Sequence, residues 1–316
     1  MRFSVIIPLF NKASYVAKAI GSVLAQTFSD FELVIVDDGS TDGSVSVATD
    51  ALRGDPRCRI IHQQNAGVSV ARNNGVAASS GDYLCFLDAD DWWEPAFLEE
   101  MDGLVKEFPE AGIYGTNYTI VNETRHKTRV AKIGVEDGFH TGYINYFKVY
   151  ADTMYMPLWT GAVCIPRMVF EEMGGFPKGI KLGEDFLLWI RIVLRYKVAF
   201  LNRPLAFYNQ DVDVASRSVG RLHKPQENML WNLDFLTETE KSDAELKQLI
   251  DNLRAYSLMP YLLDGRYRDA ARKELEKVDW SNQPEKARRL YQSPIWYLQV
   301  RQAFLAVGSK MKLILK

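Results

Sequence analysis

The chain has 316 residues, of which 47% are hydrophobic and 25% are charged, a balance typical of a globular protein with a sizeable core. Its net charge of −2 gives no bulk attraction to polyanions, so we expect no nucleic-acid partner. It contains no run of 18 apolar residues, so we expect no transmembrane helix.

The first 110 residues are predicted to alternate strands with helices. Apolar runs predict strands at 3–8, 32–37, 59–62 and 83–88. Apolar residues at helical spacing predict helices at 16–24, 44–52 and 69–78, and a fourth helix with Pro95 in its first turn. Because near-continuous apolar strands alternate with helices, we expect an α/β fold with a mainly parallel sheet that helices cover on both faces.

Polar residues follow three of these strands: Asn11, then Asp37 and Asp38, then Asp88, Asp90 and Asp91. Ligands of such sheets bind outside the carboxyl ends of the strands, so these side chains should converge. Closely spaced carboxylates repel one another, and a hard cation such as Mg²⁺ or Mn²⁺ would balance them. Since Mg²⁺ is usually held by one or two carboxylates plus substrate phosphates, we predict a metal-bound phosphate ligand here.

The pattern becomes less regular after residue 110 and then turns helical. Strand-like segments occur at 113–120, 162–165 and 198–201, between loops marked by glycine and proline. After Pro225, a capping box at Ser242–Glu245 is predicted to begin an amphipathic helix, and further helices are predicted at 261–278 and 294–305. We therefore place a helical C-terminal region at 226–316.

Three motifs each allow two interpretations. Asp38 either ends a turn and caps the next helix, or accepts hydrogen bonds from a nucleobase or a ribose. Arg72, in the helix that follows the loop at Gly67, is either a surface residue or a phosphate ligand. Glu184 and Asp185 precede an apolar helix, where they either complement the helix dipole or supply a general base.

Several other classes of site are not expected. The chain has neither a phosphate-loop lysine motif nor a Gly-x-Gly-x-x-Gly motif, and its four histidines lack the spacing of a zinc site. Cys85 and Cys164 lie in apolar runs and are predicted to be buried free thiols. Free thiols, together with the absence of a visible signal peptide, predict a cytoplasmic protein.

In their order and spacing, these motifs closely resemble those of family 2 glycosyltransferases, which are inverting enzymes with a GT-A fold. The matching segments are Val5–Asn11, Ser22–Thr27, Glu32–Asp42, Asn65–Gly67, Ala71–Asn73, Gly81–Tyr83, Leu87–Asp91, Thr160–Ala162 and Gly183–Asp185, with Trp189 and Arg191. The resemblance spans about residues 1–210. It implies a GT-A catalytic domain at 1–225, with a nucleotide-binding half at about 1–110 and an acceptor half at about 111–225.

The resemblance also implies roles for individual residues on the donor side. Pro8 and Phe10 would line the nucleobase pocket, and Asn11 would belong to the same nucleotide-binding set. Asp38 would bond the base, most often uracil, and Arg72 would lie near the base or the diphosphate. Asp88 would reach the ribose or the sugar, Asp90 would coordinate the metal, and Asp91 would support the turn.

On the acceptor side, the resemblance implies that Asp185 is the catalytic base and that Glu184 lies beside it in the acceptor region. Trp159 and Trp189 would border the sugar or the acceptor, or else belong to the core. The Gln-x-x-Arg-Trp motif of processive polysaccharide synthases is absent. We therefore expect one sugar to be added per binding event.

The function that the resemblance implies is inverting, Mn²⁺- or Mg²⁺-dependent transfer of one sugar from a nucleotide-diphosphate sugar to an acceptor hydroxyl. The donor would most often be UDP-linked, and the acceptor would be a glycan or lipid-linked glycan of bacterial surface polysaccharide assembly. Two alternatives stay open at this point: a sugar-phosphate nucleotidyltransferase, and a non-catalytic module that binds nucleotide sugars.

The C-terminal end of the sequence is basic. From Asp264 to Lys316 there are 12 Lys or Arg residues against 6 Asp or Glu residues, and residues 304–316 mix apolar side chains with lysines. This tail either rests on an anionic membrane surface or packs on the catalytic domain. In the first case the protein would be peripheral on the inner face of the membrane.

Overall fold

The computed structural model describes residues 1–122, 124–212 and 221–302. The chain forms two compact units, one of Met1–Arg221 with Gln226–Met229, and the other of Leu222–Pro225 with the chain from Leu230 onward. The first unit contains the sheet, and the second is helical.

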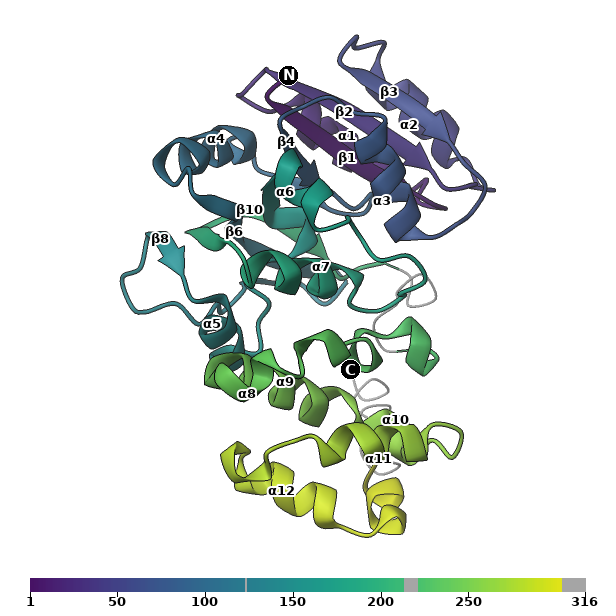
Figure 1. Ribbon diagram of the computed structural model, residues 1–316. Helices are drawn as coiled ribbons and strands as arrows, with labels where there is room; N and C mark the ends of the chain where they lie inside the picture. The colour runs from purple at the N-terminus through teal and green to yellow at the C-terminus, as the bar shows by residue number, and fades with distance from the viewer. Residues whose placement is uncertain (123, 213–220, 303–316) are drawn as a thin grey trace. The chain divides into compact units, whose positions relative to one another are not determined.

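The sheet of the first unit has ten strands, and eight of them follow the order β3-β2-β1-β4-β9-β6-β10-β5 (Figure 1). The strands are β1 (Phe3–Leu9), β2 (Phe31–Asp37), β3 (Cys58–His62), β4 (Tyr83–Phe86), β5 (Trp92–Trp93), β6 (Ala111–Asn122), β7 (Lys127–Val130), β8 (Thr141–Ile144), β9 (Val163–Pro166) and β10 (Lys197–Asn209). The four neighbours β3, β2, β1 and β4 are all parallel, as the sequence predicts.

The second half of the sheet is mixed. Strand β9 is antiparallel to both of its neighbours, β4 and β6. Strand β10 is parallel to β6 and antiparallel to β5 and β8, and β7 pairs with β6 as an antiparallel strand. The short strands β5, β7 and β8 were not predicted from the sequence.

Helices cover both faces of the parallel half. The helices of this unit are α1 (Val16–Leu24), α2 (Ser44–Leu52), α3 (Val68–Ala77), α4 (Phe97–Glu107), α5 (Tyr146–Thr153), α6 (Arg167–Glu172) and α7 (Glu184–Val193). Odd-numbered residues of β1 and β2 share a core with α1 and α4, whereas Ile6 and Val36 face α3. Alternate residues of each strand are therefore buried on opposite faces, which explains the continuous apolar runs.

Two predicted helix starts need correction. Helix α4 begins at Phe97 with Ala96 as its N-cap, so Pro95 precedes the first turn. Helix α9 (Ala244–Ser257) is capped by Asp243, whose carboxylate accepts hydrogen bonds from the backbone N–H groups of Glu245 and Leu246. Ser242 instead ends the preceding helix, α8 (Thr239–Ser242), because a carboxylate at residue 243 already satisfies the free N–H groups.

The second unit also contains α10 (Met259–Leu263), α11 (Arg268–Glu276), α12 (Glu285–Gln292) and a helical segment at 295–302. The helix predicted at 261–278 is thus two helices, separated by a turn in which Arg266 bonds Asp264. The last residues of the helix predicted at 294–305 lie outside the described residues. Within the described ranges, no helix combines the length and the apolar composition needed to cross a bilayer.

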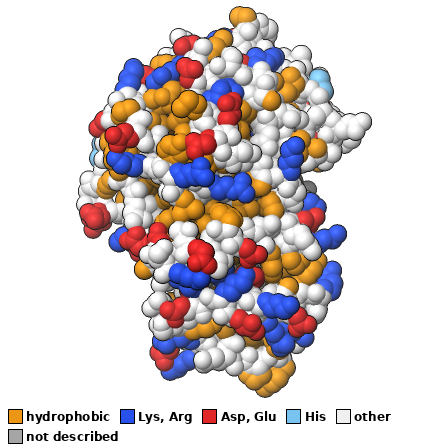
Figure 2. Space-filling model, viewed as in Figure 1, with side chains coloured by type: hydrophobic (Ala, Val, Ile, Leu, Met, Phe, Trp, Pro, Cys, Tyr) orange, Lys and Arg blue, Asp and Glu red, His pale blue; other side chains and the backbone are white. Residues whose placement is uncertain are grey.

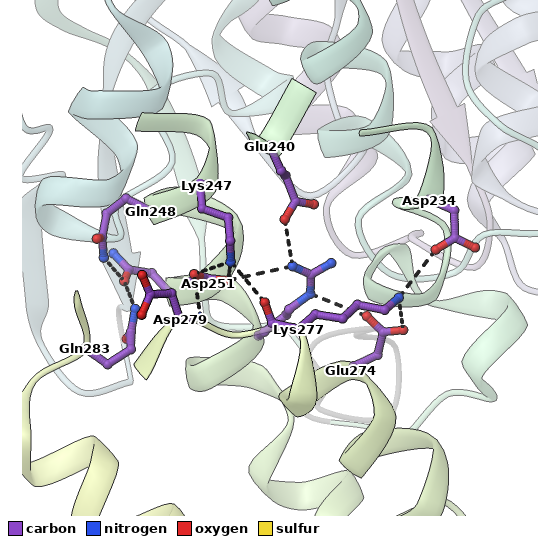
Figure 3. Close-up of polar contacts among 11 residues, drawn as sticks. Asp234, Glu240, Lys247, Gln248, Asp251, Glu274, Lys277, Asp279 and Gln283 are labelled. Carbon is purple, nitrogen blue, oxygen red and sulfur yellow. Dashed lines mark hydrogen bonds and ion pairs between the residues drawn. The ribbon is translucent and has the colours of Figure 1, made fainter. Parts of the chain in front are cut away.

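Charged and amide side chains are buried at the centre of this helical unit. Figure 3 shows Lys247 and Asp251 of α9 near Asp279, and Glu274 of α11 beside Lys277, which reaches Asp234. Arg254, whose side chain is 3% exposed, makes ion pairs with Glu240, Asp251 and Glu274. Glu240 pairs with Arg254, Asp251 with Lys247 and Glu274 with Lys277, so each of these three acids has a counter-charge.

Candidate active site

The carboxyl ends of β1, β2 and β4 lie together, because these strands are parallel neighbours in the sheet. Asn11 adopts a positive φ of 51° after β1, and its side-chain oxygen accepts a hydrogen bond from the N–H of Thr41, which follows β2. The ammonium of Lys12 contacts Asp90, which follows β4, at 2.6 Å. The predicted convergence of the strand ends is therefore present.

Asp38 holds the loop that leads into α3 in place through hydrogen bonds. Its buried carboxylate accepts hydrogen bonds from the Gln63 side chain at 2.7 Å and from the N–H groups of Ala66 and Gly67 at 2.7 and 2.9 Å. The cap of α2 is not Asp38, since Asp42 accepts the bond from the Ser44 N–H. A carboxylate has about four acceptor positions, so these three bonds do not exhaust its acceptor capacity.

Three acids crowd the turn after β4. Asp90 is nearly buried; burial raises its pKa, Lys12 opposes this rise, and the neighbouring Asp88 adds to it. Asp91 is 2% exposed, and burial together with Asp90 and Asp88 raises its pKa well above the ordinary value. Its carboxylate accepts a hydrogen bond from the Asn209 N–H at 2.7 Å, which ties the turn to the end of β10.

Arg72 connects this turn with the start of α7. Its guanidinium bonds Asp88 at 2.8 Å and Glu184 at 3.0 Å, and the residue is 3% exposed. The surface interpretation of Arg72 is therefore wrong. Burial alone would lower the pKa of Arg72, but the Asp88 and Glu184 carboxylates raise it. Burial, followed by the charge of Asp185, raises the pKa of Glu184 to about 7.

Asp185 lies in the first turn of α7, next to Glu184. Its Oδ2 accepts a hydrogen bond from the hydroxyl of Thr160 at 2.8 Å, and Thr160 is 2% exposed. The helix is preceded by Gly183 at a φ of 82°, a conformation that favours glycine. In the sequence, Thr160 stands out only as part of a matching motif, so its contact with Asp185 was not predicted.

The aromatic candidates divide by exposure. Phe10 is 45% exposed at the end of β1, whereas Pro8 is half-buried within the strand. Trp159 is 8% exposed and packs against Tyr118 and Tyr208. Trp189 has no exposed surface, and its ring packs against that of Phe176. It therefore belongs to the core, and the alternative interpretation, that it borders the acceptor, is wrong in this conformation.

A cavity of about 320 Å³ opens beside Asp90. It is lined by Ser14, Tyr15, Lys18, Asp90, Asn209 and Asp211. Sequence reasoning assigned no role to Lys12 or Lys18; the only available signal was their position just after a polar strand end. Both lysines add positive charge next to the carboxylates, which suits a ligand with negatively charged groups.

The residues at this edge fit a hard divalent ion. Asp88 and Asp90 supply carboxylate oxygens, and the charge of Asp88 adds to the rise that burial causes in the pKa of Asp90. In the part of the chain that the structure describes, no group of three or more His, Cys, Asp or Glu side chains is arranged to hold a metal. Two carboxylates are enough for an ion that also binds substrate phosphates.

Comparison with known proteins identifies the family to which this chain is similar. The family model described as glycosyl transferase family 2 matches residues 4–170, more than half of the chain. The glycosyltransferase GlyA of Streptococcus pneumoniae is 33% identical over 269 residues, which cover 83% of this chain and 36% of GlyA. An uncharacterized glycosyltransferase of Rickettsia felis is 32% identical and covers 65% of this chain. The chain spans about a third of the length of these relatives.

Solved structures show the same fold. S. aureus TarS 1–349 in complex with UDP-GlcNAc superposes with a TM-score of 0.59 at 17% identity, covering 87% of this chain and 70% of TarS. The mannosyltransferase PcManGT of Pyrobaculum calidifontis, in complex with GDP-Man and Mn²⁺, gives a TM-score of 0.55 at 17% identity and covers 99% of this chain and 80% of that one. The fold is therefore GT-A-like, with a mixed, mainly parallel sheet, and the chain belongs to glycosyl transferase family 2, a family of inverting glycosyltransferases.

Proposed function

We propose that this chain transfers a single sugar from a UDP-linked donor to an acceptor hydroxyl, with inversion at the anomeric carbon. One observation supports this proposal above the others: Arg72 contacts both Asp88, on the donor side, and Glu184, which adjoins Asp185. The proposed donor carboxylate and the neighbour of the candidate base therefore lie on either side of one cation. Inverting transfer needs two such groups, since one orients the donor while the other activates the acceptor.

In the proposed mechanism, Phe10 packs against the nucleobase, Asn11 and the remaining acceptor position of Asp38 contact the nucleoside, and Asp88 orients the ribose or sugar. Asp185 removes the proton of the acceptor hydroxyl as its oxygen attacks the anomeric carbon from the face opposite the diphosphate. Thr160 holds the Asp185 carboxylate in position. Lys12 and Lys18 add positive charge near the departing diphosphate.

A divalent metal, Mn²⁺ or Mg²⁺, is part of the proposal. Asp90 would hold it, with Asp88 nearby, and the metal would act as a Lewis acid that neutralises the leaving diphosphate. The complex of PcManGT with GDP-Man and Mn²⁺ supports this choice. Asp90→Ala should weaken metal-dependent binding of UDP, while Asp82→Ala, which removes an exposed acid before β4, should not. Unchanged UDP affinity in the Asp90 variant would remove it as the ligand.

The proposal extends to the domain bounds, the acceptor and the location of the protein. We propose a catalytic domain at 1–225 and a helical region at 226–316, with a glycan or lipid-linked glycan as acceptor in bacterial surface polysaccharide assembly. We also propose a cytoplasmic location with the basic tail, residues 304–316, on the inner face of the membrane. Co-sedimentation with liposomes should fall when residues 304–316 are deleted, and equal sedimentation would exclude the tail as an anchor.

The decisive experiment is slow hydrolysis of a panel of UDP-, GDP- and dTDP-sugars with Mn²⁺. We expect release of UDP and a free sugar, which identifies the donor without knowledge of the acceptor. Release of nucleoside triphosphate when pyrophosphate is added would instead indicate a nucleotidyltransferase. Donor binding without turnover, with or without candidate glycan acceptors, would indicate a non-catalytic module.

A further inference from the structure

The helical C-terminal unit contains a cavity of about 640 Å³ that takes no part in the candidate active site. Its apolar wall is formed by Leu262, Leu275, Trp280, Tyr291 and Ile295. The rings of Trp280 and Tyr291 pack at 5.0 Å between centroids. Small-molecule sites typically enclose about 300–1,000 Å³, so the cavity is large enough for a ligand of that size.

Arg288 gives this apolar cavity a specific polar group. Its Nε is buried and has no hydrogen-bond partner among the described residues. The next residue, Arg289, differs, because it is 76% exposed and pairs with Glu285 at 2.5 Å. Because solvent does not reach that Nε, an anion in the cavity would bond the other N–H groups of the guanidinium, which lines the cavity. Arg272 and Glu276 also line the cavity, so its charged lining is two arginines against one acid.

The chain beyond the cavity exposes aromatic side chains. Trp296 is 66% exposed, Tyr297 45% and Val300 47%, and all three lie within five residues of Ile295 in the helical segment 295–302. Figure 2 shows hydrophobic side chains and Lys or Arg side chains together on the C-terminal unit. Tryptophan and tyrosine favour the interface between membrane and water, and basic residues favour anionic lipids.

We propose that this cavity binds a phosphate-headed lipid of an anionic bilayer, with the lipid chain against the apolar wall and the phosphate on Arg288. The tail of this chain is a poorer occupant, because residues 303–316 contain three lysines and no Asp or Glu. They offer no carboxylate side chain to Arg288, and their charge has the same sign. The proposal concerns the C-terminal unit alone and does not depend on sugar transfer.

The test compares two adjacent arginines. Full-length protein with Arg288→Gln or Arg289→Gln is mixed with phosphatidylcholine vesicles, with or without an equimolar amount of phosphatidylglycerol, and bound protein is measured by flotation. We expect Arg288→Gln to weaken binding to the mixed vesicles about tenfold, as for loss of a charge-assisted hydrogen bond, and Arg289→Gln to change it little. Equal binding by the two variants would overturn the proposal.

Two further arms separate the cavity from other sources of binding. In protein that lacks residues 304–316, the difference between the two arginine variants should persist; its disappearance would assign the binding to the tail. Octyl phosphate below its micellar concentration should compete with the vesicles, whereas inorganic phosphate at the same concentration should not. Equal competition by inorganic phosphate would make this a site for free anions and not for lipid.

Discussion

Arg72 is a buried cation that satisfies two carboxylates from distant parts of the chain, Asp88 and Glu184. If the guanidinium were removed, both acids would stay in a largely desolvated place without a counter-charge. The cost of such a change is usually greater than the net stabilisation that the intact ion pair provides. Arg72 therefore has a structural role as well as the proposed role near the diphosphate.

We expect Arg72→Met to lower the free energy of unfolding by about 3–5 kcal/mol, because it leaves the largely buried Glu184 and the partly exposed Asp88 without their counter-charge. The measurement is urea unfolding at neutral pH. Arg195→Met is the matched control: it breaks a largely exposed pair with Glu172 and should cost about 0–1 kcal/mol. A similar small loss in both variants would show that Arg72 is not a structural counter-charge.

Asp185→Asn should lower the transfer rate about 100- to 10,000-fold, because an amide cannot accept the proton of the acceptor hydroxyl. The amide oxygen can still accept the hydrogen bond from Thr160, so nucleotide affinity should be retained. Thr160→Val should lower kcat with little change in the KM of the donor, since it only loosens the base. Wild-type turnover in Asp185→Asn would show that the catalytic base is another residue.

At the scale of elements, α3 approaches the sheet closely because Gly75 has no side chain. A Cβ added at Gly75 would lie 2.5 Å from Cγ2 of Ile6 in β1 and 3.0 Å from Cγ2 of Val36 in β2. In α4, by contrast, a Cβ added at Gly103 would meet nothing within 4 Å. A side chain at position 75 would therefore clash with the sheet, whereas position 103 has room for one.

We expect Gly75→Ala to destabilise the protein by about 1–3 kcal/mol through overpacking. Gly103→Ala should stabilise it by about 0.5–1 kcal/mol, since alanine has the higher helix propensity. Thermal unfolding of both variants checks the sign of each change. A stabilised Gly75→Ala variant would mean that α3 can move away from the sheet at no cost.

Glu32 fixes β2 to its neighbours. Burial would raise the pKa of Glu32, but hydrogen bonds from the Ser80 N–H, Arg59, Ser4 and the Ser80 hydroxyl lower it to about 2. Because the folded pKa is depressed, its contribution to stability is fully present above about pH 4.5 and is lost as the pH falls toward 2. Glu32→Gln should therefore destabilise the protein strongly at pH 7 and much less near pH 2.5, as urea unfolding at the two pH values would show.

At the scale of the whole molecule, the chain crosses between its two units more than once. Residues 226–229 belong to the first unit, where the backbone of Glu227 accepts bonds from the N–H groups of Lys181 and Leu182, and Met229 donates to Leu182. Met229 also packs on Gly183, which precedes α7. This segment therefore supports the loop that leads to Asp185.

A fragment that ends at the boundary predicted from the sequence, residue 225, should hydrolyse the donor more slowly than a fragment of residues 1–229. The reason is that the shorter fragment lacks the backbone partners of Lys181 and Leu182. Hydrolysis of the preferred nucleotide sugar by both fragments measures the effect, with circular dichroism as a check on folding. Equal rates would show that the segment does not support the site.

The sequence predicted the parallel half of the sheet because its strands are buried on both faces and so appear as uninterrupted apolar runs. It predicted a strand-like segment at 162–165, where β9 lies, but not that β9 runs antiparallel between β4 and β6, since a short apolar run does not specify its partners in the sheet. Asp88 and Asp90 were recognisable from their crowding. The contacts of Arg72 with Glu184 and of Thr160 with Asp185 join residues 112 and 25 positions apart, and only the folded chain brings them together.

The return of residues 226–229 to the first unit has a consequence for synthesis on the ribosome. Domains generally fold as units, starting with the N-terminal one. Here the loop before α7 stays without its backbone partners until Met229 has been translated and has left the exit tunnel. By then translation has already entered the helical unit, so the candidate base cannot reach its final position before synthesis of that unit has begun.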